Sequence, residues 1–185
     1  MDIIERISCM LEINGTGLYG GEAVTQTQHA LQCAALAEAD GASAQLITAA
    51  LLHDVGHVLD PEFEAALEHG QDLVHEDLGE NFLHNWFGEQ VTQPVKLHVA
   101  AKRYLCAIDD SYFARLSEAS VLTLKLQGGP MSGIETAEFE ANPYHCDAVR
   151  LRVWDDLAKD PDAETPDIAH FMAYAARCLK TGAQA

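Results

Sequence analysis

Residues 49–60, AALLHDVGHVLD, decide the fold of this 185-residue chain. A run of apolar, helix-forming residues ends in His53 and Asp54, and His57 follows one helical turn later. Imidazole and carboxylate groups are common ligands of transition metals, and an aspartate is rarely buried without a partner. The stretch therefore predicts a buried helix that carries metal ligands at its end.

The sequence on either side of this stretch also predicts helices, because apolar residues recur there at helical spacing. The predicted helical ranges are 2–13, 25–40, 44–54, 74–87, 91–107, 111–127, a short helix before Asn142-Pro143, 144–158 and 167–180. Residues 14–22, which include four glycines, are predicted as a loop. Residues 61–72 are predicted as a loop or a short helix.

Capping residues, glycines and prolines mark the ends of several of these helices. The markers are Ser43 as an N-cap, Pro94 in a first helical turn, Gly128-Gly129-Pro130 as a stop, Thr165-Pro166 as the start of the last helix and Gly182 just beyond its end. The sequence shows no alternating strand pattern, internal repeat or linker. It predicts an all-α fold that forms a single domain over residues 1–185.

The chain is acidic, with 29 Asp and Glu against 11 Lys and Arg and a formal net charge of −18. Such a surface repels nucleic acids and anionic membranes, so neither is expected as a partner, and no obligate protein partner is inferred. Five cysteines without a CxxC motif indicate reduced thiols. The N-terminus lacks a signal-peptide pattern and the apolar runs are too short to span a membrane, so we expect a cytoplasmic protein.

Six histidines and aspartates form an ordered set along the predicted helices. They are His29, His53, Asp54, His75, His98 and Asp155. A lone histidine on a helix is more often a packing or surface residue, and this is the expectation for His69, His84, His145 and His170. The ordered set suits iron, manganese or zinc in the core of a helical bundle, and Asp54 can bridge two metal ions. The sequence thus predicts a central dinuclear metal site.

The order H…HD…H…H…D resembles the HD-domain superfamily, an all-helical fold with metal at its centre. Most of its members are phosphohydrolases, but four segments point to a different activity. They are GLYGGEAVTQTQHA (17–30), HVAAKRYL (98–105), RLSEASVLTLKLQGGPMS (115–132) and LRVWDD (151–156). Together they resemble the 2-amino-1-hydroxyethylphosphonate oxygenases, which are mixed-valent diiron HD enzymes related in chemistry to myo-inositol oxygenase. The resemblance runs from Leu18 to Asp156.

This resemblance implies two iron ions, Fe(II)/Fe(III), as cofactors and O₂ as a co-substrate. One iron would be held by His29, His53, Asp54 and Asp155, and the other by Asp54, His75 and His98. Tyr19 would bind the first iron until substrate arrives, and Glu22 would move with it to meet a cationic nitrogen of the substrate. The phosphonate contacts implied are His57, Lys102, Ser120 and Arg152.

The implied substrate is a small organophosphonate whose C–P bond is cleaved oxidatively. Two relatives fit: one forms glycine from 1-hydroxy-2-aminoethylphosphonate, and the other forms glycine betaine from its N-trimethylated analogue. Gly20 follows Tyr19 where we expect a larger aliphatic residue in the aminoethyl enzymes. The missing bulk would make room for three methyl groups, which favours the trimethylated substrate.

Two other functions remain open from the sequence. A dinuclear HD phosphohydrolase would use the same six ligands on a nucleotide or small phosphate ester, with a metal-bound hydroxide as nucleophile. A degenerate HD module would only bind a ligand or partner. The loop with Tyr19 and Glu22 weighs against the hydrolase, and the intact ligand set weighs against the module.

Overall fold

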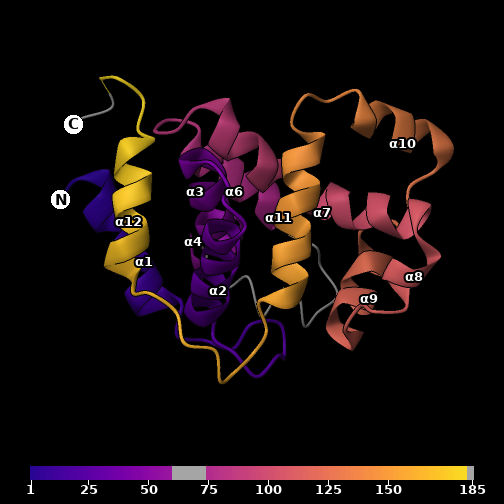
Figure 1. Ribbon diagram of the computed structural model, residues 1–185, viewed down its shortest axis with the longest axis horizontal. Helices are drawn as coiled ribbons and strands as arrows, with labels where there is room; N and C mark the ends of the chain where they lie inside the picture. Colours follow the sequence, from indigo (N-terminus) through magenta and orange to yellow (C-terminus); the bar gives the residue numbers. More distant parts are fainter. Residues whose placement is uncertain (60–73, 183–185) are drawn as a thin grey trace.

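The computed structural model describes residues 1–59 and 74–182, which form a bundle of packed helices (Figure 1). The helices are α1 (Ile3–Asn14), α2 (Gln26–Ala39), α3 (Ala44–Leu52), α4 (Val55–Leu59), α6 (His75–Leu83), α7 (Glu89–Ile108), α8 (Asp110–Phe113), α9 (Glu118–Leu126), α10 (Gly133–Glu140), α11 (His145–Leu157) and α12 (Ile168–Arg177). Within these residues the only β-structure is two isolated bridges, Leu18–Thr25 and Phe87–Leu179. The predicted all-α fold is confirmed.

Side-chain caps explain why the first helices begin where they do. Asp2 and Thr25 each form a capping box, in which the cap side chain accepts from the third helical N–H and the side chain at that position returns the hydrogen bond. Ser43 accepts from the backbone N–H of Leu46, as predicted. The next helix, α3, is buried along nearly its whole length. It therefore delivers His53 to the interior at its C-terminal end.

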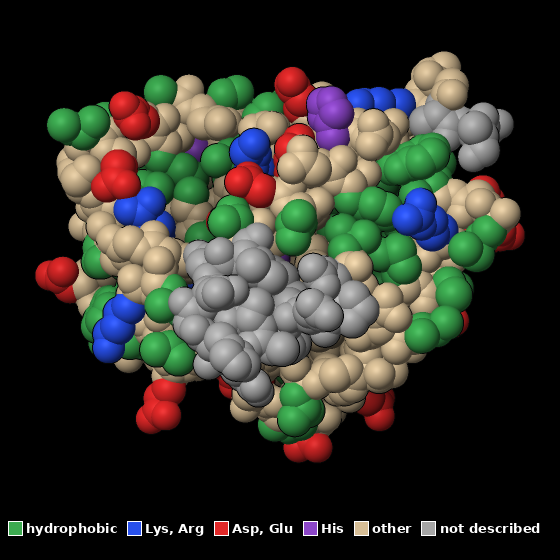
Figure 2. All heavy atoms as spheres, turned by 180° about the vertical axis from the view of Figure 1, so that it is seen from behind, with side chains coloured by type: hydrophobic (Ala, Val, Ile, Leu, Met, Phe, Trp, Pro, Cys, Tyr) green, Lys and Arg blue, Asp and Glu red, His purple; other side chains and the backbone are tan. Residues whose placement is uncertain are grey.

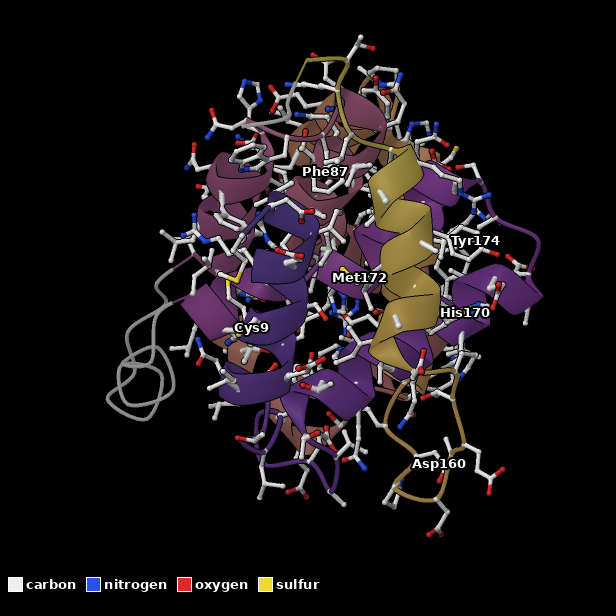
Figure 3. The ribbon with its side chains drawn as sticks, turned by 90° about the vertical axis from the view of Figure 1, so that its left-hand side faces the viewer. Cys9, Phe87, Asp160, His170, Met172 and Tyr174 are labelled. Carbon is white, nitrogen blue, oxygen red and sulfur yellow. The ribbon has the colours of Figure 1, made fainter. Side chains whose placement is uncertain are left out.

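The main hydrophobic core lies where α1, α2, α3, α11 and α12 pack together. Ile7, Leu51 and Leu151 are fully buried members of this core, and Phe87 and Met172 extend it (Figure 3). On the other side of α11, the long helix α7 supports α8, α9 and α10 (Figure 1). Helices α7 and α11 therefore separate the main core from a smaller helical lobe.

The structure corrects three predicted helix boundaries. Pro94 lies in the second turn of α7 because this helix begins at Glu89, capped by the extended backbone of Gly88. The predicted helix 111–127 is two helices, because Ser117 caps α9 and interrupts the helical path after α8. The last helix is capped by Asp167 and not Thr165, because the Asp167 carboxylate accepts from His170 N–H.

A fourth predicted end marker, Gly182, is also wrong, whereas Gly128 agrees with the structure. The stop at Gly128 is confirmed, since its backbone φ of 93° is in the left-handed region that glycine favours. Gly182 has a φ of 92°, but α12 already ends at Arg177, so this glycine does not terminate the helix. The prediction for residues 61–72 lies outside the described residues.

The surface carries mixed charges. On the face shown in Figure 2, Lys and Arg side chains stand apart from one another among acidic and apolar groups. On α12, His170 and Tyr174 both contact the carboxylate of Glu38, on the side of that helix away from Met172 (Figure 3). None of the helices in the described part of the chain is long and apolar enough to cross a membrane.

Candidate metal centre

Five segments deliver the six predicted ligands to one buried place. His29 comes from α2, and the His53-Asp54 pair from the turn after α3. His75 opens α6, His98 lies in the middle of α7, and Asp155 lies near the end of α11. All six are buried, with at most 8% of any one exposed.

Gly56 allows α4 to approach the start of α6. A Cβ atom at this position would lie 2.2 Å from the backbone oxygen of His75, which is closer than non-bonded atoms can come. Only a residue without a side chain fits here. Gly56 therefore helps to bring His75 beside Asp54.

Backbone carbonyl groups fix the orientation of three imidazoles. The Nδ1 atoms of His29, His53 and His98 lie 2.8, 2.8 and 2.6 Å from the carbonyl oxygens of Ala158, Ala50 and Val95. A carbonyl oxygen only accepts hydrogen bonds, so each Nδ1 carries the hydrogen. In the neutral imidazole the lone pair then lies on Nε2, which is the arrangement of a histidine metal ligand.

The carboxylate of Asp54 lies between two pairs of imidazoles. Its Oδ2 is 3.3 Å from His53 Nε2 and 3.7 Å from His29 Nε2. Its Oδ1 is 3.2 Å from His75 Nε2 and 3.4 Å from His98 Nε2. The donor atoms of His29, His53 and Asp54 lie within 4.8 Å of one another, and so do those of Asp54, His75 and His98. One carboxylate oxygen thus serves each group, as a bridging ligand requires.

Asp155 and Tyr19 complete the group formed by His29 and His53. Asp155 Oδ1 lies 3.4 Å from His29 Nε2, and Asp155 Oδ2 lies 4.0 Å from His53 Nε2. The Tyr19 hydroxyl donates to Asp155 Oδ1 at 3.3 Å, and its ring stacks on that of His29 with centroids 3.7 Å apart. The phenol oxygen therefore lies beside this group and not beside the other one.

The donor set fits two metal cations. The Nε2 atoms of His29 and His53 are 3.1 Å apart, and those of His75 and His98 are 3.0 Å apart. Two lone pairs that face each other at this distance repel unless a proton or a cation lies between them. The buried Asp54 Oδ2 has no hydrogen-bond partner among the described residues, which is costly without a cation. Four nitrogens and two carboxylates suit divalent transition metals.

Electrostatics in this cluster favour the charged carboxylates. Burial raises the pKa of Asp54, but the neighbouring His53, His75 and His98 outweigh burial and hold it well below its usual range. Burial likewise lowers the pKa of His53, but the Asp54 carboxylate and Cys33 raise it well above the ordinary value of 6.5. The pKa of His75 is raised too, so without metal protons on His53 and His75 help to balance the buried carboxylates.

A cavity of about 350 Å³ opens beside the cluster. Its walls include Asp54, His75, His98 and Asp155, so the candidate metal centre is part of its surface. Every predicted substrate-contacting residue also lines it. These residues are Glu22, His57, Lys102, Ser120 and Arg152, and Tyr19, the predicted iron ligand, lines the cavity as well.

Positive charge and hydroxyl groups gather on the part of the cavity wall formed by Lys102, Ser120, Thr123 and Arg152. Lys102 donates to the Thr123 hydroxyl at 2.9 Å, and burial beside Arg152 lowers the pKa of its ammonium to about 8. Arg152 is buried and stays charged, because Asp155 and Asp156 raise its pKa against the effect of burial. This wall can bind an anion.

His57 lies next to the ligand group formed by Asp54, His75 and His98. Its ring centroid is 4.4 Å from that of His75, and its Nε2 is 3.9 Å from Asp54 Oδ1. Burial and the neighbouring His75 lower its pKa to about 3. His57 is therefore a neutral imidazole at physiological pH.

Lys159 is a cavity residue that the sequence analysis missed. Its ammonium lies 3.4 Å from Glu22 Oε1 and donates to the Ser120 hydroxyl at 3.3 Å. The flanking residues hold it there, because Ala158 accepts from His29, and Asp160 (Figure 3) exchanges two hydrogen bonds with Gln32 of α2. Nothing in the local sequence, LAKDPD, distinguishes this lysine from an exposed loop residue.

Other missed residues are Thr123 and Gln127 on the cavity wall and Tyr112 and Asp156 behind Arg152. Asp156 could have been found from its spacing, since it lies four residues after Arg152 on one helix face. Thr123 lies one helical turn after Ser120 and could have been found in the same way. No spacing in the sequence indicates that Tyr112 lies near Arg152.

Comparison with known proteins agrees with this geometry. A model of the HD domain matches residues 27–132. The chain is 43% identical over 178 residues to [1-hydroxy-2-(trimethylamino)ethyl]phosphonate dioxygenase (glycine-betaine-forming) of Leisingera caerulea, covering 96% of this chain and 91% of that protein. It is 44% identical over 180 residues to hydroxymethylphosphonate dioxygenase of Gimesia maris, covering 95% of this chain and 89% of that protein.

The HD-domain match includes five of the six clustered ligands, and only Asp155 lies beyond it. Both dioxygenases align along almost the whole chain, so the resemblance extends to the part that carries Asp155. The helical architecture, the paired histidine–aspartate groups and these similarities lead to one conclusion: the chain belongs to the HD-domain family, in the branch that contains the phosphonate dioxygenases.

Proposed function

We propose that this protein is an O₂-dependent diiron oxygenase that cleaves the C–P bond of a 1-hydroxyphosphonate. The reaction R–CH(OH)–PO₃H₂ + O₂ → R–COOH + H₃PO₄ balances without an external reductant. The observation that carries the proposal is the cavity that joins two histidine–aspartate groups to an anion-binding wall. The names of both dioxygenase relatives describe phosphonates with a hydroxyl group on the phosphorus-bearing carbon.

In this proposal His29, His53, Asp54 and Asp155 hold one iron, and Asp54, His75 and His98 hold the other. When bound, the iron pair supplies the redox chemistry with O₂ that the protein side chains lack. The protein contributes by fixing the ligands. Backbone carbonyls hold three of the imidazoles, and Asp54 offers one oxygen to each site. We also infer that the protein acts in the cytoplasm, in keeping with five free cysteines.

The anion-binding wall is proposed to hold the phosphonate. Lys102 and Arg152 supply charge, and Ser120 supplies a hydroxyl donor. His57 is neutral, so it can donate one hydrogen bond without adding charge. With the phosphonate held at this wall, the carbon that bears the hydroxyl group lies toward the metal centre.

Tyr19 is proposed to bind the first iron until substrate arrives. Burial and the Asp155 carboxylate raise the pKa of its phenol, so in the metal-free protein it remains protonated. Its hydroxyl already lies beside Asp155, on the side of the cluster that faces the cavity. Its backbone N–H and C=O are held by Val24 and Glu22, within the same loop.

Tyr19→Phe is therefore expected to leave the iron content unchanged but to alter the visible absorption of the substrate-free, iron-loaded protein. Phenylalanine keeps the stacking on His29 and removes only the oxygen ligand. Tyr104→Phe is the matched control, because the Tyr104 hydroxyl contacts the exposed Glu140 and Tyr104 is not among the residues that line the cavity. An absorption spectrum identical to wild type in Tyr19→Phe would contradict the role of Tyr19 as a ligand.

The group beyond the hydroxylated carbon is proposed to face Glu22 and Gly20. A trimethylammonium group fits the carboxylate charge of Glu22 and the open space at Gly20, where a Cβ atom would meet no described atom within 4 Å. The φ of 50° at Gly20 also favours glycine for backbone reasons. The amine and the unsubstituted hydroxymethylphosphonate fit the same space, so substrate comparison decides among the three.

The test is phosphate release by the iron-loaded protein with and without O₂. The substrates are 1-hydroxy-2-(trimethylammonio)ethylphosphonate, 1-hydroxy-2-aminoethylphosphonate and hydroxymethylphosphonate, with a generic phosphate ester alongside. We expect release from a phosphonate only when O₂ is present. The substrate with the highest kcat/KM identifies the preferred group beyond the hydroxylated carbon.

A phosphohydrolase is the second candidate, because the paired groups could also hold metals that activate water. Phosphate release from the ester without O₂ would establish it and contradict the oxygenase. A protein that binds no iron or manganese and releases no phosphate would instead be a binding module.

A further inference from the structure

We infer that Asp156 and Tyr112 are positioning residues that fix the guanidinium of Arg152 for the substrate. This inference rests on the proposed function, in which Arg152 contacts the phosphonate. Neither Asp156 nor Tyr112 is among the residues that line the cavity, whereas Arg152 is. Both therefore act through Arg152.

Asp156 accepts two hydrogen bonds from one edge of the Arg152 guanidinium. Its Oδ2 accepts from Arg152 Nε at 3.2 Å, and its Oδ1 accepts from Arg152 Nη2. Two parallel hydrogen bonds between a carboxylate and a guanidinium fix the plane of the guanidinium as well as its position. The pair is four residues apart on α11, so the helix itself sets the geometry.

Tyr112, which lies on α8, contacts both Asp156 and Arg152. Its hydroxyl donates to Asp156 Oδ2 and accepts from Arg152 Nε at 3.1 Å. The ring is buried with Cys106 and Leu124, which belong to α7 and α9. Tyr112 thus ties α11 to the helices that form the anion-binding wall.

A second carboxylate is needed because Asp155 has another role. Arg152 Nη1 contacts Asp155 Oδ2 at 2.7 Å, but Asp155 Oδ1 faces His29 and Tyr19. A metal ion bound to Asp155 would withdraw charge from the Asp155 carboxylate and weaken the ion pair between Asp155 and Arg152. Asp156 has no contact with the six ligands among the hydrogen bonds and ion pairs of the described residues, so its hold does not depend on the metal.

The remaining donors of Arg152 can serve the substrate. A guanidinium has five N–H donors. The contacts with described residues engage the single Nε–H, which Asp156 and Tyr112 share, one N–H of Nη1 and one N–H of Nη2. Two donors remain on the two terminal nitrogens. With the plane fixed by Asp156 and Tyr112, these two donors keep one direction before the phosphonate arrives.

The experiment compares Asp156→Asn, Asp156→Glu and Tyr112→Phe in the metal-loaded protein. Asparagine would direct an N–H group at the guanidinium, which has no hydrogen-bond acceptor. We expect Asp156→Asn to raise the KM for the best phosphonate about tenfold or more, because a charged hydrogen bond is lost. We expect Tyr112→Phe to raise this KM about fivefold, because a neutral hydrogen bond is lost. kcat should change less than KM, and Asp156→Glu should recover most of the wild-type KM.

A direct binding measurement accompanies the kinetics. The dissociation constant of inorganic phosphate for the metal-loaded protein should rise in the same order, as measured by titration calorimetry without O₂. Asp40→Asn is the matched control for Asp156→Asn, because Asp40 forms an exposed ion pair with Arg150 of the same helix at 2.9 Å. Tyr104→Phe is the matched control for Tyr112→Phe.

Several results would overturn the inference. Wild-type KM and phosphate affinity in both Asp156→Asn and Tyr112→Phe would do so. A fall in kcat that follows the metal content at unchanged KM would show a structural role only. Failure of the proposed function looks different, since wild type would then release no phosphate from any phosphonate. The phosphate titration would still test whether Asp156 and Tyr112 position Arg152.

Discussion

Asp54→Ala is expected to lower kcat/KM for phosphonate cleavage by about three orders of magnitude or more and to prevent the protein from holding two metal ions. Asp54 is the one residue that belongs to both groups of potential ligands. Its Oδ2 faces His29 and His53, and its Oδ1 faces His75 and His98. Its loss removes a ligand from each proposed metal site and the negative charge that the two sites share.

Asp54→Asn separates the charge of this residue from its shape. Asparagine keeps the size and one acceptor oxygen, but its NH₂ group cannot bind a metal. We expect Asp54→Asn to hold at most one metal ion per chain and to remain nearly as inactive as Asp54→Ala. Metal content by mass spectrometry and kcat/KM for the best phosphonate would be measured on the same preparations.

Asp77→Asn is the matched control, because Asp77 is a half-exposed carboxylate on α6 that pairs only loosely with Lys96, at 3.8 Å. It should keep both metals and full activity. An Asp54→Ala variant with two metal ions per chain and wild-type kcat/KM would falsify the bridging role. Loss of activity with both metals retained would instead place Asp54 in the chemistry without making it a bridge.

The His53-Asp54 part of the candidate metal centre could be predicted because its signals are local in sequence. His53-Asp54 follows a run of apolar residues that can only be buried, and the helix ends within two residues of the predicted place. Ser43 caps that helix through its own side chain, three residues from its partner. Signals of this kind need no knowledge of the rest of the fold.

The errors occurred where tertiary structure overrides local signals. Pro94 is tolerated in the second turn of α7, although a proline there removes a helical hydrogen bond. The break between α8 and α9 depends on Ser117, whose side chain caps α9 at Ser120 N–H, although the apolar periodicity continues across it. Propensity is a weak guide at such places, because a side-chain cap can start a new helix within a continuing apolar pattern.

The cavity wall was only partly predictable. Lys102 and Arg152 follow from their spacing to His98 and Asp155 on single helices. Lys159 does not, because its position depends on how the chain leaves α11 and is anchored to α2 through Gln32. Tyr112 reaches Arg152 from α8, forty residues away in sequence. Contacts between distant segments have no signature in one sequence.

Removal of the metal ions is expected to abolish phosphate release and to lower the thermal unfolding midpoint by about 10 °C or more. Metals at about 100 times their dissociation constant stabilise the fold by about 2.7 kcal/mol per site. About 5 kcal/mol for two sites corresponds to roughly 10–20 °C in a chain of this size. Without metal, two buried carboxylates and four buried imidazoles remain in the core without the cations that their arrangement suits.

The size of this effect is expected to depend on pH. In the metal-free protein, burial lowers the pKa of His53 and His75, but Asp54 more than compensates, so both are raised above their ordinary value of 6.5. Both imidazoles must lose their protons to bind metal, so metal affinity increases as pH rises through these raised pKa values. The decrease in the thermal unfolding midpoint on chelation should therefore be larger at about pH 8 than at about pH 6.

The measurement is differential scanning calorimetry of the iron-loaded and chelator-treated protein at both pH values. Asp54→Ala provides the control, because a protein that cannot hold both metals should show a much smaller change on chelation. Re-addition of Fe(II) to the wild type should restore the midpoint and the activity together. If chelation removed activity but left the midpoint unchanged at both pH values, the histidine–aspartate cluster would be stable without cations. The repulsion between the facing Nε2 atoms would then have to be relieved by protons alone.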